Sequence, residues 1–296
     1  MSRWRHALLV LAALLATGCA QPPPSAQDTA RIDDHIPELF PRGPQPEAGD
    51  YEIDGRRVHY VVMPGGPQRL IFIHGTPGNW QGWRDYLADP RLRQRATIIA
   101  VDRPGFGNSG RGRMVPDIAD QARLLAPLLD LADGGQGKAY LVGHSLGGPI
   151  AAKLAMDHPE RVAGALLIAP SIAPDLEHPR WFNHMADTWL AKALAGTWVQ
   201  RQFADDDLYN SNAEIMPLAR GLKAMEPGWA SLTLPVIVVQ GLQDTLVDPA
   251  TADYAERVLP TPNGRVIRLP NHDHFLIWSD YERCARLVAE LLDHGS

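Results

Sequence analysis

The sequence predicts an α/β protein in which a mostly parallel, doubly wound sheet carries helices on both faces. Three observations lead to this fold class. Short apolar runs alternate with amphipathic helical runs from Tyr51 onward. The strand-like runs are apolar on both faces, as expected where helices cover both sides of a parallel sheet. One long interval without strand signals interrupts the alternation, which predicts a helical insertion into an otherwise regular α/β domain.

The first element is an antiparallel hairpin. Its sequence is YEIDGRRVHYVVM, two extended runs joined at Asp54-Gly55, a pair that favours a tight hairpin turn. The buried-strand candidates then follow in order as RLIFIHG, ATIIAVD, AYLVGHS, VAGALLIAP, LPVIVVQG and GRVIRLP. Between and after them, helices are predicted in DIADQARLLAPLLDLA, GPIAAKLAMDHPERV and SDYERCARLVAELLDHG.

The interruption covers about residues 173–232. It is rich in helix formers and contains Trp181, Trp189 and Trp198. We expect a helical cap above the carboxyl edge of the sheet, the edge where ligands bind in open α/β sheets.

The N-terminal residues 1–18 have the pattern of a signal peptide. Arg3 and Arg5 precede ten apolar residues, too few for a bilayer span, which takes about 20 residues. The following LATGCA resembles the lipobox of bacterial lipoproteins, which implies cleavage before Cys19 and lipidation of its thiol. Ala20, rather than aspartate, follows the cysteine; by the same resemblance this implies an anchor in the outer membrane of the cell envelope, facing the periplasm.

Residues 19–48 form a proline-rich segment, which we expect to be an extended tether between lipid and body. The remaining residues, 49–296, are expected to form the catalytic domain. The full chain has 28 basic and 34 acidic residues, a net charge of −6, which gives no electrostatic reason to expect nucleic acid as a partner. Cys284 is the only other cysteine and is expected to be a packing residue.

The chemical centre is predicted at Ser145, in the pentapeptide GHSLG. A strand signal precedes the motif and a helix signal follows it, as in a nucleophile elbow. The alternative is a strand-to-helix turn that merely needs small residues. A serine nucleophile also requires a base and a group that orients the base.

The downstream motifs supply both groups. GLQD places Asp244 just after a buried strand, and LPNHDHF places His274 after the last strand. In these motifs the chain resembles the α/β-hydrolase superfamily, in its branch of serine esterases, peroxidase-like hydrolases and carbon–carbon bond hydrolases. The resemblance covers about residues 50–296. It implies that His274 is the base and Asp244 its partner. His272 remains an alternative base, and Asp248 and Asp175 remain alternative acids.

The same resemblance implies the anion-stabilising groups. HGTPG, after the first buried parallel strand, resembles the superfamily's His-Gly-x-Pro loop. Carried over, the backbone N–H groups of Thr76 and Leu146 form the oxyanion hole, and His74 braces the loop. DRPGFGNSG is expected to be a structural turn, because it lacks the lysine of a P-loop and the acidic partner of a dinucleotide site. His272 and His274 have no third metal ligand at a recognisable spacing, so no metal or cofactor is predicted.

These features predict a serine hydrolase that cleaves an ester-like bond in a small or apolar acyl substrate through an acyl-enzyme. A serine nucleophile argues against the dehalogenases and epoxide hydrolases of the superfamily, which use aspartate. The alternatives are an aminopeptidase-like enzyme, whose relatives carry His-Gly-Gly-Pro in place of His-Gly-Thr-Pro, a carbon–carbon bond hydrolase and, from a different class, a non-catalytic binding lipoprotein. The expected partners are a small-molecule substrate and a membrane. The sequence does not set the oligomeric state.

Overall fold

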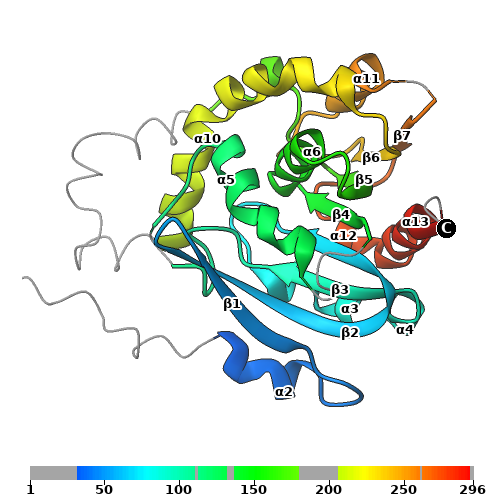
Figure 1. Ribbon diagram of the computed structural model, residues 1–296. Coiled ribbons are helices and arrows are strands. Elements are labelled where there is room, and N and C mark those ends of the chain that lie inside the picture. Colours follow the sequence, from blue (N-terminus) through cyan, green and yellow to red (C-terminus); the bar gives the residue numbers. More distant parts are fainter. Residues whose placement is uncertain (1–31, 111–112, 132–136, 180–205, 261, 294–296) are drawn as a thin grey trace, which may run out of the picture. The chain divides into compact units, whose positions relative to one another are not determined.

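The computed structural model describes residues 32–110, 113–131, 137–179, 206–260 and 262–293 (Figure 1). The chain divides into two compact units, Met1–His35 and Ile36–Ser296. In the first unit the described residues form one short 3₁₀ turn, η1 (Ile32–His35). Every element discussed below belongs to the second unit. The lipidation candidate Cys19 lies outside the described residues.

The second unit is built on a seven-stranded sheet with the order β1-β2-β4-β5-β6-β7, and β3 also pairs with β2. The strands are β1 (Glu47–Ile53), β2 (Arg56–Ile73), β3 (Ala96–Val101), β4 (Ala139–His144), β5 (Val162–Ile168), β6 (Val236–Gly241) and β7 (Gly264–Leu269). The pairs β2·β4, β4·β5, β5·β6 and β6·β7 are all parallel. The predicted mostly parallel α/β sheet is confirmed.

The opening hairpin has the expected turn. β1 pairs antiparallel with the first part of β2, and Ile53 faces Arg56 across the turn. Asp54 has φ 52° and Gly55 has φ 66°, the left-handed conformation that both central residues of a type I′ turn require. Asp-Gly tolerates that conformation, so the local sequence sets the register of the hairpin.

β2 has two arms, with β3 between them. In the first arm the partners run in opposite order, from Tyr60 facing Val101 to Met63 facing Ile98. In the second arm the order is parallel and ends with Ile73 facing Val101. The chain turns between the arms at residues 65–66, two glycines whose Cβ atoms would collide with the backbone of residues 93–96 at the start of β3. This doubling back places the end of β2 beside β4.

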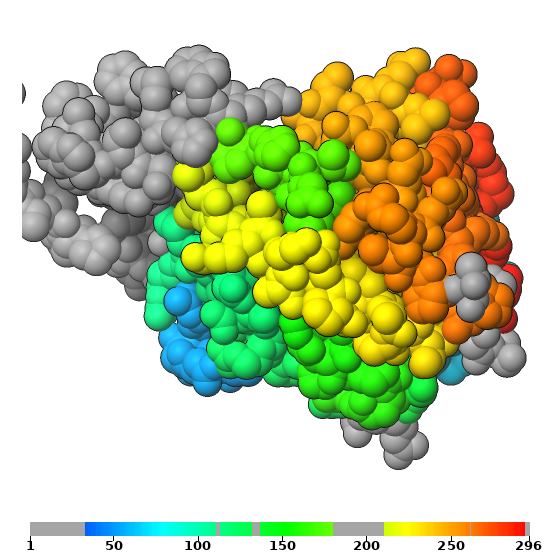
Figure 2. Space-filling view, turned by 90° about the horizontal axis from the view of Figure 1, so that it is seen from above, coloured from blue at the N-terminus to red at the C-terminus, as the bar shows by residue number. Residues whose placement is uncertain are grey.

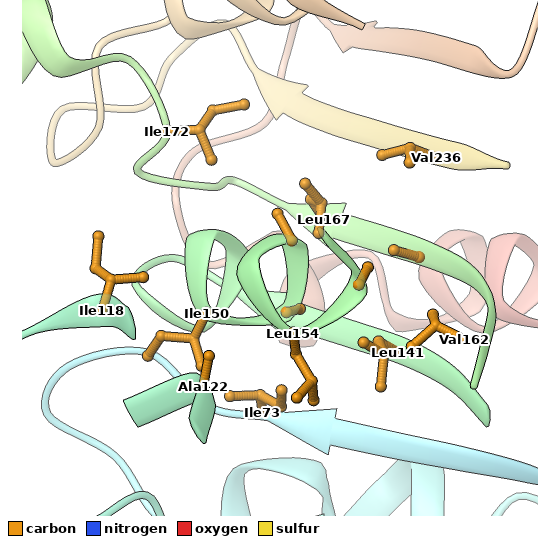
Figure 3. Close-up of a cluster of buried hydrophobic side chains, with 14 of the residues drawn as sticks. Ile73, Ile118, Ala122, Leu141, Ile150, Leu154, Val162, Leu167, Ile172 and Val236 are labelled. Atoms are coloured by element: carbon orange, nitrogen blue, oxygen red, sulfur yellow. The ribbon is translucent and has the colours of Figure 1, made fainter. Parts of the chain in front are cut away.

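One face of the sheet carries a large apolar core. The helices that pack here are α5 (Ile118–Leu125), α6 (Gly147–Asp157) and α11 (Thr251–Val258). Figure 3 shows side chains of α5 and α6, such as Ile118 and Leu154, in the same cluster as Ile73, Leu141 and Leu167 of the strands. The alternation of side chains along each strand sends these residues to one face.

The opposite face is covered by helices α3 (Arg84–Ala88), α4 (Pro90–Arg93) and α13 (Tyr281–Asp293), with η2 (Trp80–Trp83). Phe72 points to this side, where its ring lies 4.7 Å from that of Trp83 and 5.3 Å from that of Tyr86. Cys284 of α13 is fully buried, as expected for a packing residue. Helices therefore cover both faces of the sheet.

The helix predicted over residues 117–132 is shorter than expected. The α-helix ends at Leu125, and the chain continues as the 3₁₀ helix η3 (Ala126–Asp130). Pro127 explains the change, because proline has no N–H group to donate to the preceding turn.

The interval between β5 and β6 contains no strand in its described part. The helices of that described part are η4 (Pro174–Leu176), α10 (Asp206–Met225) and η5 (Glu226–Ser231). Figure 2 shows α10 and η5, in yellow, across the face seen from above, beside the orange residues of α11. The predicted tryptophans of the cap, Trp181, Trp189 and Trp198, lie outside the described residues.

The proline-rich segment differs from a wholly extended tether. Its residues 36–39 form the short helix α2 (Ile36–Leu39), and the Phe40 N–H group donates to the Ile36 carbonyl at 2.9 Å. Both side chains are buried, because apolar groups four residues apart on one helical turn share a face. Over the ranges that the structure describes, no helix has the length and hydropathy to cross a membrane.

Candidate active site

Three side chains predicted to act together lie after the carboxyl ends of strands in one continuous part of the sheet. Ser145 follows β4, Asp244 follows β6 and His274 follows β7. These strands are joined in the order β4-β5-β6-β7, so their carboxyl ends share one edge. The exposed fractions of the three residues are 8%, 5% and 6%, respectively.

Ser145 occupies a strained corner. Its φ is 52°, in the left-handed region that non-glycine residues rarely adopt. The corner is held by main-chain bonds, since Ser145 N–H donates to the Ile168 carbonyl at 3.0 Å and its own carbonyl accepts from Gly148 N–H at 2.9 Å. Helix α6 begins two residues later, at Gly147. This is the strand–turn–helix geometry of a nucleophile elbow.

The glycines around Ser145 are required by close backbone approaches. A Cβ atom at Gly143 would collide with the carbonyl of Gly147, and one at Gly147 would collide with the carbonyl of Ile73. Across the site, a Cβ atom at Gly75 would lie 2.8 Å from the Cβ of Ser145. The loop after β2 therefore lies directly against the serine.

His274 and Asp244 form a buried hydrogen-bonded pair. The Nδ1 atom of His274 lies 2.8 Å from Oδ2 of Asp244. A carboxylate only accepts hydrogen bonds, so Nδ1 carries the proton and Nε2 is left as the basic nitrogen. The predicted pairing of an imidazole with an acid from the preceding strand is present.

The surroundings of Asp244 keep it charged. Burial by itself raises the pKa of this carboxyl, but the hydrogen bond from His274 and the amides of Val247 and Leu246 outweigh burial, so the pKa is lowered. The two amides donate to Oδ1 at 2.9 and 2.8 Å, and Gln240 Nε2 donates to Oδ2 at 3.1 Å. The carboxylate is therefore fixed in orientation and ionised.

His144, between glycine and serine in the pentapeptide, was not singled out in the sequence. Its Nε2 lies 3.0 Å from the carbonyl oxygen of His274, and the two rings are 4.9 Å apart between centroids. Burial, with a smaller contribution from the neighbouring His274, lowers the pKa of His144 to about 3. The neutral ring donates to that carbonyl, so the nucleophile motif itself fixes the position of the histidine loop.

Ser145 and His274 are brought to the same place without a direct bond between them. Within the described residues, the structure contains no hydrogen bond from Ser145 Oγ to the His274 ring. The two residues are nevertheless neighbours, because His144, which directly precedes Ser145, contacts His274. Such bonds are often long in ligand-free active sites and shorten when substrate binds.

The backbone amides of Thr76 and Leu146 lie in the two loops that meet at Ser145. Among the described residues neither amide donates a hydrogen bond. His74 braces the first loop, with Nδ1 2.7 Å from the Gly75 carbonyl and Nε2 accepting from Arg103 N–H at 2.9 Å. Burial and then the Arg103 charge hold the pKa of His74 well below its usual range, so the ring is neutral.

The alternative base, His272, and the alternative acids, Asp248 and Asp175, lie outside the pair formed by Asp244 and His274. His272 Nε2 lies 2.8 Å from Oδ2 of Asp280. Asp248 is exposed, and its Oδ1 accepts from the Ala250 N–H group. Asp175 is exposed within η4. The structure pairs none of the three with the hydrogen-bonded couple of Asp244 and His274.

The glycine-rich segment after β3 is a structural turn. Asp102 is fully buried, and its side chain accepts from the N–H groups of Trp80 and Asn108, both at 2.7 Å. Gly107 has φ 51°, and a Cβ atom there would collide with the Asp102 carboxylate. The buried Asp102 carboxylate therefore holds the turn together from inside.

A buried charged cluster beside the site was also missed. Arg103 of that turn contacts Glu214 of α10 at 2.6 Å and Gln121 of α5 at 2.6 Å. The position of Arg103 directly after the strand candidate ATIIAVD, at the start of a glycine-rich turn, was a signal of an internal role. Nothing in the local sequence of α10 distinguishes Glu214 from a solvated helix residue.

Glu177 and the aromatic residues Phe275 and Trp278 also lie near the site. Burial raises the pKa of Glu177 to about 7, although a hydrogen bond with Ser171 opposes the rise. The ring of Phe275 lies 5.6 Å from that of His274 and stacks on Trp278 at 5.9 Å, and both aromatic side chains are about half exposed. In the described parts of the chain no group of three or more His, Cys, Asp or Glu side chains could hold a metal ion.

Comparison with known proteins agrees with this fold. Two solved structures are similar to this chain over most of their length. Their sequence identities to it are low, so the similarity shows a shared fold and no more. An E-2-(acetamidomethylene)succinate hydrolase has 23% identity and a TM-score of 0.60, covering 84% of this chain and 99% of that one. A membrane phospholipase A has 22% identity and a TM-score of 0.60, covering 99% and 98%.

A family model identifies the family, and a curated relative is similar over most of this chain. A protein of Cupriavidus necator, named as the dihydrolipoyllysine-residue acetyltransferase component of an acetoin cleaving system, is 30% identical over 263 residues, 78% of this chain and 68% of the relative. The model of the alpha/beta hydrolase family matches residues 70–287, which include the end of β2, the HGTPG loop, the GHSLG motif and the histidine loop. The chain belongs to the alpha/beta hydrolase family.

Proposed function

We propose that the protein is a serine hydrolase that cleaves an ester-like bond of a small or apolar acyl substrate. Ser145 is the nucleophile, His274 the base and Asp244 the group that orients the base. The observation that carries the proposal is the buried 2.8 Å contact between His274 Nδ1 and an ionised Asp244, at the sheet edge that also holds the strained Ser145. A structural turn needs no such pair.

In the first half-reaction, Ser145 Oγ attacks the substrate carbonyl carbon and His274 Nε2 takes the hydroxyl proton. The carbonyl electron pair moves to oxygen, and the amides of Thr76 and Leu146 donate to the oxyanion. The tetrahedral intermediate then collapses, the bond to the leaving group breaks, and His274 returns the proton to the leaving oxygen. Asp244 stabilises the imidazolium formed between these steps.

In the second half-reaction, water attacks the acyl carbon of the Ser145 ester. His274 Nε2 accepts a proton from that water, and the same two amides stabilise the second oxyanion. Collapse releases a carboxylic acid, and the proton returns from His274 to Ser145 Oγ. The cycle balances without an oxidant, a reductant or a cofactor.

The preference for an apolar acyl group rests on the side chains next to the base. Phe275 and Trp278 form an exposed aromatic pair beside the His274 ring. Exposed aromatic faces favour apolar substrate groups, because contact removes both surfaces from water.

Labelling with a fluorophosphonate probe tests the proposed nucleophile. The wild-type protein should be labelled at one serine, and Ser145→Ala should not be labelled, because the probe phosphonylates an activated hydroxyl. Ser109→Ala is a matched control, since Ser109 is a buried serine whose hydroxyl is hydrogen bonded in the turn after β3. An unlabelled wild type would favour the non-catalytic binding lipoprotein.

The substrate class is tested with a panel of p-nitrophenyl esters of rising chain length, run beside aminoacyl anilides. We expect the esters to be cleaved faster and the rate to depend on chain length. Faster cleavage of the anilides would favour the aminopeptidase-like alternative. Labelling at Ser145 without cleavage of either series would direct attention to carbon–carbon bond substrates.

The proposal includes a lipid anchor at Cys19 that holds the enzyme on the outer membrane, facing the periplasm. The signal pattern and the lipobox resemblance support it. Anchoring by several acyl chains is stable, whereas a single chain binds a membrane only marginally.

A further inference from the structure

Arg103 lies at the centre of a buried polar network that connects three elements of the fold. It is fully buried, and Glu214 and Gln121 are each only 1% exposed. Its Nη1 donates to Glu214 of α10 and to Gln121 of α5, both at 2.6 Å, and its Nη2 donates to the other Glu214 oxygen at 3.1 Å. Gln121 Nε2 also donates to Glu214, at 2.7 Å. Such a network favours one arrangement of its members, because a buried polar group that lost its partners would be costly in the low-dielectric interior.

The same guanidinium contacts the loop that carries Thr76. Arg103 Nη2 donates to the Gly75 carbonyl at 2.8 Å, and His74 Nδ1 lies 2.7 Å from the same oxygen. The backbone N–H of Arg103 fixes His74 in turn, by donating to its Nε2 at 2.9 Å. Arg103 therefore holds the Gly75 carbonyl directly with its side chain and indirectly through His74.

The orientation of that carbonyl determines the direction of the next amide. The Gly75–Thr76 peptide is planar and trans, so its C=O and N–H groups point in opposite directions. With the Gly75 carbonyl held toward Arg103, the Thr76 N–H points away from it. Gly75 itself lies against Ser145.

Helix α10 contacts this loop a second time. Thr76 Oγ1 donates to Ser211 Oγ of α10 at 3.0 Å, and Glu214 lies less than one helical turn further along. The loop is therefore connected to α10 at Thr76 and, through Arg103, at Gly75. A change in the position of α10 would reach the Gly75–Thr76 peptide by both routes.

We propose that Arg103 is a positioning residue for the oxyanion hole. It holds the Gly75–Thr76 peptide in the orientation that offers the Thr76 amide to the substrate oxygen, and Glu214 makes that orientation depend on α10. The inference rests on the proposed serine hydrolase function. Arg103 does not touch the substrate in this mechanism, and its effect is exerted through the peptide.

The test compares Arg103→Met and Arg103→Lys with Arg69→Met. Arg69 is a matched control, because it is 2% exposed and donates to the Leu129 carbonyl from the start of the second arm of β2, at the opposite edge of the sheet. The measurements are melting temperature, kcat and KM for p-nitrophenyl butyrate, and affinity for two ketones with the same alkyl chain. A trifluoromethyl ketone forms an oxyanion adduct with the nucleophile, whereas the methyl ketone serves as the ground-state analogue.

Arg103→Met should lower kcat about 100-fold, the effect expected when one oxyanion donor is lost, with KM changed less than threefold. Affinity for the trifluoromethyl ketone should fall by a similar factor, and affinity for the methyl ketone should stay the same. Arg103→Lys should recover part of the kcat, because an ammonium group still donates to the Gly75 carbonyl. Arg69→Met should lower the melting temperature and leave kcat unchanged.

Three results would overturn the proposal: a loss of kcat no larger in Arg103→Met than in Arg69→Met, an equal loss of affinity for both ketones, or a change confined to KM. If Arg103→Met does not fold, Glu214→Gln replaces it, with an expected tenfold loss of kcat, and an unchanged kcat there also overturns the proposal. A wild type that does not hydrolyse the ester, or is labelled equally after Ser145→Ala, would instead refute the proposed function.

Discussion

At the scale of single residues, two positions with a strained backbone lie at and beside the proposed nucleophile. Ser145 and Ala169 both have positive φ, 52° and 45°, and they follow the neighbouring strands β4 and β5. The two corners are connected, since Ser145 N–H donates to the Ile168 carbonyl and Ser171 N–H to the Ser145 carbonyl. Strained conformations persist only where surrounding contacts enforce them, and they cluster at functional sites.

The role of Asp244 gives a residue-scale prediction. Asp244→Asn should lower kcat by about 10⁴-fold, because an amide can donate to Nδ1 and so favours the tautomer in which Nε2 carries the proton. KM should change little. Asp248→Asn is the matched control, since this exposed carboxylate keeps an acceptor for Ala250 N–H after the change. Steady-state kinetics of both variants checks the assignment, and a similar loss in both would contradict it.

Local motifs made some site residues predictable and left others hidden. Ser145, Asp244 and His274 each follow a strand signal at a recognisable spacing, and the structure places Asp244 against His274. The contact between Arg103 and Glu214 joins residues 111 positions apart, so no local pattern could reveal it. His144 was hidden for a different reason, because the pentapeptide specifies glycine and serine but leaves that position open.

At the scale of elements, the start of α6 lies so close to the end of β2 that position 147 has no room for a side chain. Gly147→Ala should destabilise the protein by about 3 kcal/mol, because the new methyl group would meet the Ile73 carbonyl, which cannot move without breaking the sheet. Gly82→Ala is the matched control, since the nearest atom to its Cβ would be Trp278 Cζ2 at 3.5 Å, an ordinary contact. Denaturant titration measures both changes. An equally small loss of stability in the two variants would contradict the packing argument.

The elements were predictable where the signal is local. Asp54-Gly55 gave the hairpin, and the apolar runs gave the parallel strands. Both arms of β2 coincide with predicted extended segments, but the pairing of both arms with β3 was not foreseen, because it depends on contacts with residues more than 25 positions away. The packing of Ile36 and Phe40 was also missed, because the many prolines around them favoured an extended chain over a short helical turn.

At the scale of the whole molecule, the proposed anchor predicts where the enzyme is found. The wild type should sediment with membranes and incorporate radiolabelled palmitate, and Cys19→Ala should do neither, because no other group in the proposal carries a lipid. Cys284→Ala is the matched control, since that thiol is buried in α13. Retention of Cys19→Ala in the membrane fraction after a salt wash would contradict the lipid anchor.

The separation of the three proposed catalytic side chains along one row of strands also has a consequence during biosynthesis. Ser145 leaves the ribosome long before β7, and His274 has no place to dock until β7 has joined β6. A nascent chain therefore carries the Ser145 hydroxyl without its proposed base through most of the second half of its synthesis. In the proposed hydrolase, the three catalytic side chains are therefore complete only after β7 and the loop that follows it have been added to the sheet.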